Sequence, residues 1–140
     1  FGDWSSDVCS SYLTHRTLEA LYRRLEAGLA ATPGLRLIPR PQAESYVASS
    51  FQFLLPGWDA ARITAFVARA AARGVELKWF GAAEPAGFTS RYDSWRYAAP
   101  QSLPVTDRVL AGLLDLRLPL TFTEADAAQI ARIIDAEARG

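Results

Sequence analysis

The side chains best suited to chemistry lie within one stretch of the chain, residues 79–97. Trp79 and Phe80 end a predicted strand, and Arg91 and Tyr92 follow in a segment without periodicity. A guanidinium group is a natural bidentate partner of a carboxylate or a phosphate, and aromatic rings offer flat stacking surfaces. We therefore expect Arg91, Tyr92, Trp79 and Phe80 to be substrate-binding residues, with Arg91 as the anion contact.

Each of these residues also has a simpler interpretation. Arg91 could be a surface arginine stacked on Tyr92 or Trp95. Trp79 and Phe80 could be core or subunit-interface aromatics. The sequence leaves both alternatives open.

The other reactive side chains predict neither a catalytic residue nor a metal site. His15 has no catalytic partner nearby in the sequence, and one histidine with one cysteine cannot supply a zinc site or an internal disulfide. Lys78 is the single lysine, and strand alternation points it away from the core. A solvated lysine is therefore expected there rather than a Schiff-base amine.

Composition limits the class of protein. The chain has 140 residues, enough for one domain, and its 15 basic and 15 acidic side chains balance. That balance offers no basic excess for a nucleic-acid backbone, and no apolar run approaches the ~20 residues that span a bilayer. There is no methionine and the first residue is Phe1, so we expect a truncated reading frame.

Residues 2–13 resemble a translated sequencing-library adapter and depart from it only at Tyr12. They show neither a helical nor a strand period, so residues 1–13 are expected to be a non-native, disordered tail. A natural Ser-rich terminus is the alternative. Asp3, Asp7 and Cys9 lie in this segment, so the remainder has 13 acidic and 15 basic residues, a net charge of +2, and no cysteine. A cysteine-free domain suits the cytoplasm.

The periodicity of the remainder predicts an α/β fold, a small four-stranded, mostly antiparallel or mixed sheet packed by helices. Helices are expected over residues 17–31, from Asp59 to near Gly74, from Pro104, and from a capping-box start at Thr123. Strands are expected over residues 35–38, 49–55, 75–80 and 114–118. Residues 81–102 form a 22-residue stretch without periodicity, which is long for a compact domain.

Several short motifs, in order, resemble the C-terminal small domain of the DegT/StrS family of fold-type I, pyridoxal-phosphate-dependent aminotransferases. They cover nearly all of residues 14–138: Tyr22-x-x-Leu25, Pro33-Gly34-Leu35, the strand at 49–53, Arg73-Gly74-Val75-Glu76, Leu103-Pro104-Val105-Thr106-Asp107-Arg108, Leu116-Arg117-Leu118-Pro119-Leu120, and Thr123-Glu124-Ala125-Asp126.

The resemblance implies a homodimeric enzyme that moves an amino group from an amino-acid donor to a keto acceptor, often a sugar. It implies that the Schiff-base lysine, the aspartate at the pyridine nitrogen and most of the phosphate cup lie in a large domain upstream of Thr14. Residues 14–140 alone would then be inactive and would not bind pyridoxal 5'-phosphate. Trp79, Phe80, Arg91 and Tyr92 would approach the active-site mouth. Trp79-Phe80-Gly81 stands where many relatives have a histidine and a tyrosine, so the resemblance does not fix a nucleotide sugar as acceptor.

The competing hypothesis is an autonomous, non-catalytic ligand-binding or interaction module that uses the loop at 81–102. The two hypotheses predict different surfaces. A fragment should expose an apolar face along Leu18, Leu21 and Leu25 or at the aromatic loop, whereas an autonomous module should cover its apolar stripes.

Overall fold

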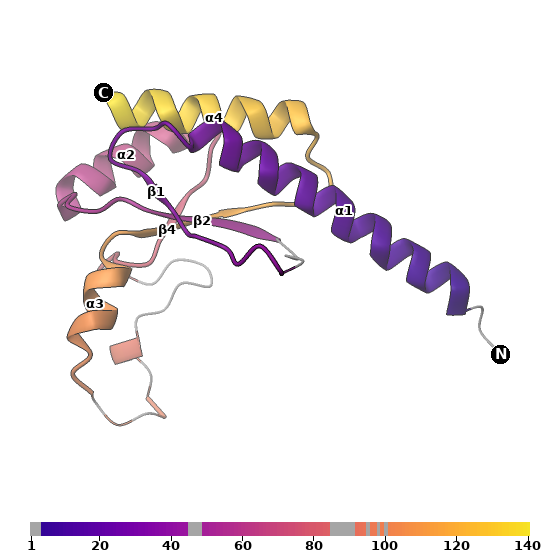
Figure 1. Cartoon of the computed structure of the whole chain (residues 1–140). Helices are drawn as coiled ribbons and strands as arrows, with labels where there is room; N and C mark the ends of the chain where they lie inside the picture. The colour runs from indigo at the N-terminus through magenta and orange to yellow at the C-terminus, as the bar shows by residue number, and fades with distance from the viewer. Residues whose placement is uncertain (1–3, 45–48, 85–91, 95, 98, 100) are drawn as a thin grey trace.

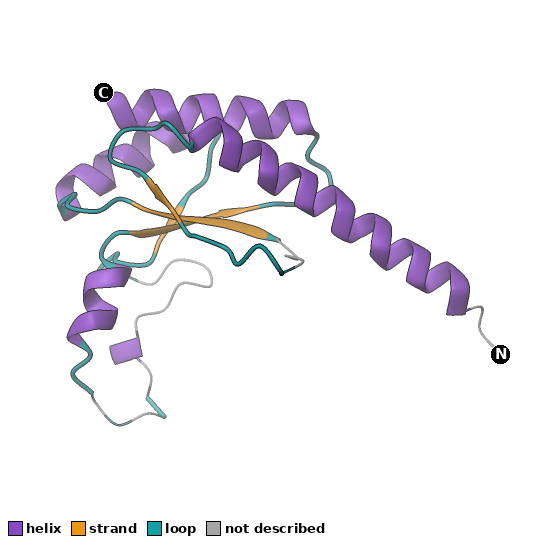
Figure 2. Ribbon diagram, in the orientation of Figure 1, coloured by secondary structure: helices purple, strands orange, loops and turns teal. Residues whose placement is uncertain are grey.

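A computed structural model describes residues 4–44, 49–84, 92–94, 96–97, 99 and 101–140. Within these ranges the elements run α1 (Trp4–Leu29), β1 (Arg36–Leu37), β2 (Ser50–Leu54), α2 (Ala60–Ala72), β3 (Lys78–Trp79), the 3-10 turn η1 (Tyr92–Ser94), α3 (Pro104–Leu110), β4 (Leu113–Arg117) and α4 (Glu124–Arg139) (Figure 1). The strands form one sheet in the order β1-β2-β4-β3, and every pairing is antiparallel. Helices α1, α2 and α4 lie together on one side of the sheet (Figure 2). The predicted α/β class is confirmed.

The central strand pair provides the floor of the core. β2 and β4 pair so that Phe51 lies opposite Leu116 and Phe53 opposite Leu114. Both phenyl rings are fully buried. Because alternate residues of a strand point to opposite faces, this register places the apolar sets of both strands under the helices. The strands predicted over residues 49–55 and 114–118 are confirmed as β2 and β4.

One residue of this pair departs from the expected pattern. Asp115 lies between Leu114 and Leu116 and so points to the opposite face of the sheet, yet it is only 8% exposed. Its Oδ1 atom has no hydrogen-bond partner among the described residues. The sheet face opposite the helices is therefore covered at this point, which alternation within a single strand does not reveal.

Helices α1 and α4 pack closely on each other and on the sheet. Leu21, Leu25 and Leu29 of α1 are at most 1% exposed. Ala127 and Ala131 of α4 are at most 2% exposed. The stripe that includes Leu18 is therefore covered within the chain, so of the two exposed faces that the fragment hypothesis allowed, the one along α1 is absent and the one at the aromatic loop stays open. The large apolar side chains left exposed in the described residues lie elsewhere: Tyr12, Leu13, Tyr97, Val105, Val109 and Leu120.

Helix α1 begins at Trp4, well before the predicted start at residue 17. Its first turns project away from the rest of the fold (Figure 1). Residues 4–13 are thus helical, which corrects the expectation of an irregular tail. They contain neither Pro nor Gly, and extending an existing helix costs far less than nucleating one. Their adapter origin concerns the coding sequence and stays a prediction.

Although α1 has 26 residues, no helix in the described ranges is long and apolar enough to cross a membrane.

The local signals at the ends of α2 and α4 are confirmed. The Asp59 side chain accepts a hydrogen bond from the Arg62 amide at 2.8 Å, and Gly74 has the left-handed φ of +83° expected after α2. Thr123 and Asp126 form a reciprocal capping box.

Strand β3 is shorter than the predicted strand at 75–80. Val75 and Leu77 are buried, as core-facing residues of such a strand would be. The Val75 amide, however, donates to the Ala70 carbonyl at 2.9 Å and so closes the end of α2 instead of joining the ladder. Regular pairing with β4 therefore begins only at Lys78.

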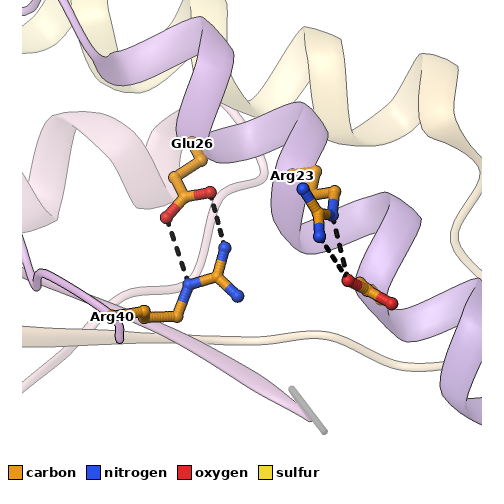
Figure 3. A network of polar contacts seen from close by, with 4 residues as sticks. Arg23, Glu26 and Arg40 are labelled. Carbon is orange, nitrogen blue, oxygen red and sulfur yellow. Dashed lines mark hydrogen bonds and ion pairs between the residues drawn. The ribbon is translucent and has the colours of Figure 1, made fainter. Parts of the chain in front are cut away.

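The segment after β1 is held against α1 by Arg40. Its guanidinium binds both carboxylate oxygens of Glu26, at 2.7 and 3.3 Å (Figure 3). It also lies 4.6 Å from the centre of the Tyr22 ring. That ring packs at 4.8 Å on Phe51. The side chains of Arg40 and Glu26 are 19% and 28% exposed. This interaction joins the segment, the helix and the core.

We expect Arg40→Gln to lower the free energy of unfolding by about 1–2 kcal/mol, because it leaves a partly buried carboxylate without its charged partner. Arg23→Gln is the matched control: Arg23 bonds Glu19 on the same helix but is 67% exposed, and exposed pairs contribute little. Urea unfolding measures both. Equal effects of the two substitutions would contradict the anchoring role of Arg40.

Candidate functional site

Trp79, Phe80 and Tyr92, the predicted site residues that the structure describes, lie at the end of the sheet where β3 meets α3. Trp79 pairs with Leu114 of β4, and the Phe80 amide donates to the Leu113 carbonyl at 3.0 Å. Because α3 leads directly into β4, the same ladder brings α3 beside Trp79 and Phe80. Main-chain hydrogen bonds therefore fix the position of these two aromatic residues.

Trp79 is both a packing residue and a cavity wall. Its indole Nε1 donates to the Ala111 carbonyl at 2.9 Å, and its ring packs against the edge of the core. It also lines a cavity of about 500 Å³, together with Thr64 and Val67 of α2 and Lys78 of β3. This volume lies in the range of ligand cavities. The core and ligand interpretations of Trp79 are thus compatible.

Phe80 and Tyr92 meet at a different, smaller cavity. They line about 100 Å³ together with Asp107 and Leu110 of α3. The Tyr92 hydroxyl donates to Asp107 Oδ1 at 2.9 Å. This space is too small for a substrate. The hydrogen bond to Asp107 holds Tyr92 against α3. Sequence reasoning missed Asp107 as a site residue because nothing local signals its contact with Tyr92.

The turn after β3 requires glycine. A Cβ atom on Gly81 would lie 2.7 Å from the Trp79 indole nitrogen and 2.8 Å from the Ala111 Cα atom. Such distances are closer than van der Waals contact allows, and the Ala111 contact is backbone. Gly81 therefore permits the close approach of Trp79 to the end of α3.

The structure brings together only part of the predicted set. Phe80 and Tyr92 share one cavity, and Trp79 lines another. Arg91 lies outside the described residues, as does Trp95. The anion-binding and stacking interpretations of Arg91 therefore both stay predictions.

The remaining reactive groups make no metal centre. No group of three or more metal-ligating side chains occurs among the described residues. Lys78 is half-buried and also lines a cavity of about 640 Å³, with Glu76 and Arg117 as charged neighbours. Ala71 and Gly74, at the carboxyl end of α2, line the same cavity. The negative end of the helix dipole disfavours an anion there.

We expect Asp107→Asn to lower the pKa of Tyr92. The hydrogen bond to the Asp107 carboxylate raises the pKa of this phenol above its ordinary range. The hydrogen bond therefore contributes to stability below about pH 10, and this contribution is lost as the pH rises through the raised pKa of Tyr92. The absorbance of tyrosinate at alkaline pH measures the change, with Tyr92→Phe identifying the signal and Glu124→Gln on α4 as control. An unchanged titration in Asp107→Asn would show that the bond is not formed.

No protein-family profile and no curated protein matches the chain by sequence. Solved structures do share its fold. The aminotransferase TlmJ from Streptoalloteichus hindustanus superimposes with a TM-score of 0.67 and 22% identity, over 87% of this chain and 31% of that one. A 3-amino-5-hydroxybenzoic acid synthase superimposes with a TM-score of 0.67 and 23% identity, over 91% of this chain and 35% of that one. A DegT DnrJ EryC1 StrS aminotransferase from Brucella abortus has a TM-score of 0.64 and 16% identity, over 87% of this chain and 30% of that one.

These likenesses show that the chain has the fold of one part of these aminotransferases. It spans about a third of their length.

Proposed function

We propose that residues 14–140 are the C-terminal small domain of a pyridoxal-phosphate-dependent aminotransferase. The parent enzyme would transfer an amino group from an amino-acid donor to a keto acceptor, often a sugar. The observation that carries this proposal is the partial match: most of this chain superimposes on about a third of each neighbour. The ordered motifs quoted above are a second, sequence-based support.

The described residues do not fit the cofactor by themselves. Pyridoxal phosphate needs an amine, a carboxylate for its pyridine nitrogen and a cradle for its phosphate. The 500 Å³ cavity beside Lys78 has no carboxylate in its lining. The 640 Å³ cavity has Glu76, but it lies at the unfavourable end of α2. We therefore assign no catalytic role to Lys78 and propose that the isolated chain is inactive.

In the parent, we assign the aromatic end of this domain to the mouth of the active site. The ladder with β4 fixes Trp79 and Phe80 at this end of the domain, and Asp107 positions Tyr92. Arg91 directly precedes Tyr92 in the sequence and would contact a carboxylate or phosphate of the substrate. Asp107 is thus a positioning residue in this proposal.

The exposed apolar residues support a larger assembly. Val105 is 69% exposed and Tyr97 is 85% exposed, and both belong to the segment around α3. We propose that the large domain and the second subunit of a cytoplasmic homodimer cover this region. The autonomous module remains the second proposal, and the burial of Leu21 and Leu25 inside the chain favours it.

The test is activity of the complete enzyme. The full reading frame, expressed with its upstream part, should bind pyridoxal phosphate and use glutamate as amino donor with a keto sugar. Arg91→Lys in that enzyme should raise KM for donor or acceptor, because the bidentate contact is lost. A complete chain that neither binds the cofactor nor transfers an amino group would contradict the proposal.

A further inference from the structure

A separate cavity of about 470 Å³ lies between the turn after β2 and the end of α3. Apolar groups of Leu55, Trp58 and Val109 form much of its lining, and Arg36 and Arg108 enter it from β1 and α3. Trp79, Phe80 and Tyr92, the residues of the predicted substrate site that the structure describes, do not line it. Cavities that bind small molecules share this volume and this combination of apolar walls with a few polar groups.

Backbone contacts hold the walls of this cavity in place. The Leu55 amide donates to the Gly112 carbonyl at 2.9 Å. A Cβ atom on Gly112 would lie 3.1 Å from the Leu55 carbonyl oxygen, so the two strands approach as closely as glycine allows. The shape of this side of the cavity is therefore set before any ligand binds, which lowers the cost of binding.

Trp58 is fixed by its neighbours. The Arg62 guanidinium lies 3.7 Å from the centre of the Trp58 ring. The ring also meets Phe66 edge-on, at 5.6 Å between centroids. Trp58 is thus a rigid apolar wall, and Arg62 is engaged in holding it.

Within the described ranges, Arg36 and Arg108 lack the ion pairs that several other arginines of the structure form. Arg69 and Arg73 both bind Glu137, and Arg139 binds Asp135. Arg36 and Arg108 are exposed and form no ion pair with any described residue. Among the described residues, no acidic side chain lines the cavity. It therefore presents two guanidinium groups with free donors beside an apolar pocket.

We propose that this cavity binds a small carboxylate with an apolar body. The guanidinium groups of Arg36 and Arg108 donate to the carboxylate, because their planar geometry matches its two oxygens. The apolar body packs against Leu55, Trp58 and Val109. A free phosphate would leave these apolar walls unused, so the lining favours the carboxylate. This proposal does not rest on the aminotransferase assignment.

Hexanoate is the probe and is added to the full 140-residue chain. The readout is the signal of the Trp58 indole Nε1–H group in a ¹H–¹⁵N spectrum. We expect saturable binding, weakened at least about fivefold for acetate, which lacks the body, and for hexanamide, which lacks the charge. Arg36→Gln and Arg108→Gln should each weaken hexanoate binding about fivefold. Arg24→Gln, an exposed arginine on α1, should not change it.

Each outcome has one meaning. Tighter binding of hexanoate than of both analogues, lost in the two cavity variants alone, supports the site. Equal binding of hexanamide, or unchanged binding in Arg36→Gln and Arg108→Gln, overturns the charge recognition. Absence of any saturable change overturns the site itself. Thermal unfolding of each variant checks the fold, and both arginines are exposed, so we expect it to be unchanged.

Discussion

Phe51→Ala is expected to lower the free energy of unfolding by about 3–5 kcal/mol, the largest effect of any single change considered for this chain. Phe51 is fully buried, and its ring contacts Tyr22 at 4.8 Å and Phe53 at 6.3 Å between centroids. Its removal leaves a cavity between β2 and α1 that the rigid ladder with β4 cannot close. Urea unfolding of the two proteins measures the difference.

Leu54→Ala is the matched control for Phe51→Ala. Leu54 belongs to the same strand but lies on the opposite face and is only half-buried. We expect a loss of about 1 kcal/mol or less there. Comparable losses at the two positions would mean that the helices do not cover the face we assign to the core.

Gly28→Ala is expected to destabilise the fold by up to about 2 kcal/mol, although alanine is the better helix former by about 1 kcal/mol. A Cβ atom on Gly28 would lie 2.6 Å from the Cβ atom of Ala131 on α4. Neither methyl group can rotate away, so α1 and α4 must separate, and overpacking of this kind costs about 1–3 kcal/mol. The expected sign is thus opposite to that of helix propensity.

The double variant Gly28→Ala/Ala131→Gly tests this explanation. It restores the space between the helices while keeping alanine in α1. We expect it to unfold at a higher urea concentration than Gly28→Ala alone, with a favourable coupling energy between the two positions. Additive losses would show that the overlap is not the cause.

Local signals in the sequence predict most of the fold. The alternation at Phe51 and Phe53, the caps at Asp59 and Thr123, and the left-handed position at Gly74 depend on neighbouring residues alone. They were readable because each satisfies a backbone group or a strand face within a few positions.

Features set by distant contacts could not be predicted. The burial of Asp115 depends on what lies over the sheet. The contact of Tyr92 with Asp107 depends on how η1 meets α3. That Arg36 and Arg108 line the same cavity depends on the order of the strands. The local pattern of residue types carries no information about contacts between residues that are distant in the sequence.

The candidate site was therefore only partly predictable. Trp79 and Phe80 were predicted from their place at the end of a strand, and the structure places Trp79 against the end of α3. Their part in substrate binding stays a prediction. The sequence did not separate the two cavities that these residues line.

The nucleotide sequence upstream of the codon for Thr14 tests the central claim most directly. Sequencing the parent gene across that point should reveal, in the same reading frame, a large domain with a Schiff-base lysine, in place of the codons for residues 2–13. A natural start codon close to Thr14 would contradict the claim and leave the autonomous module as the explanation of the fold.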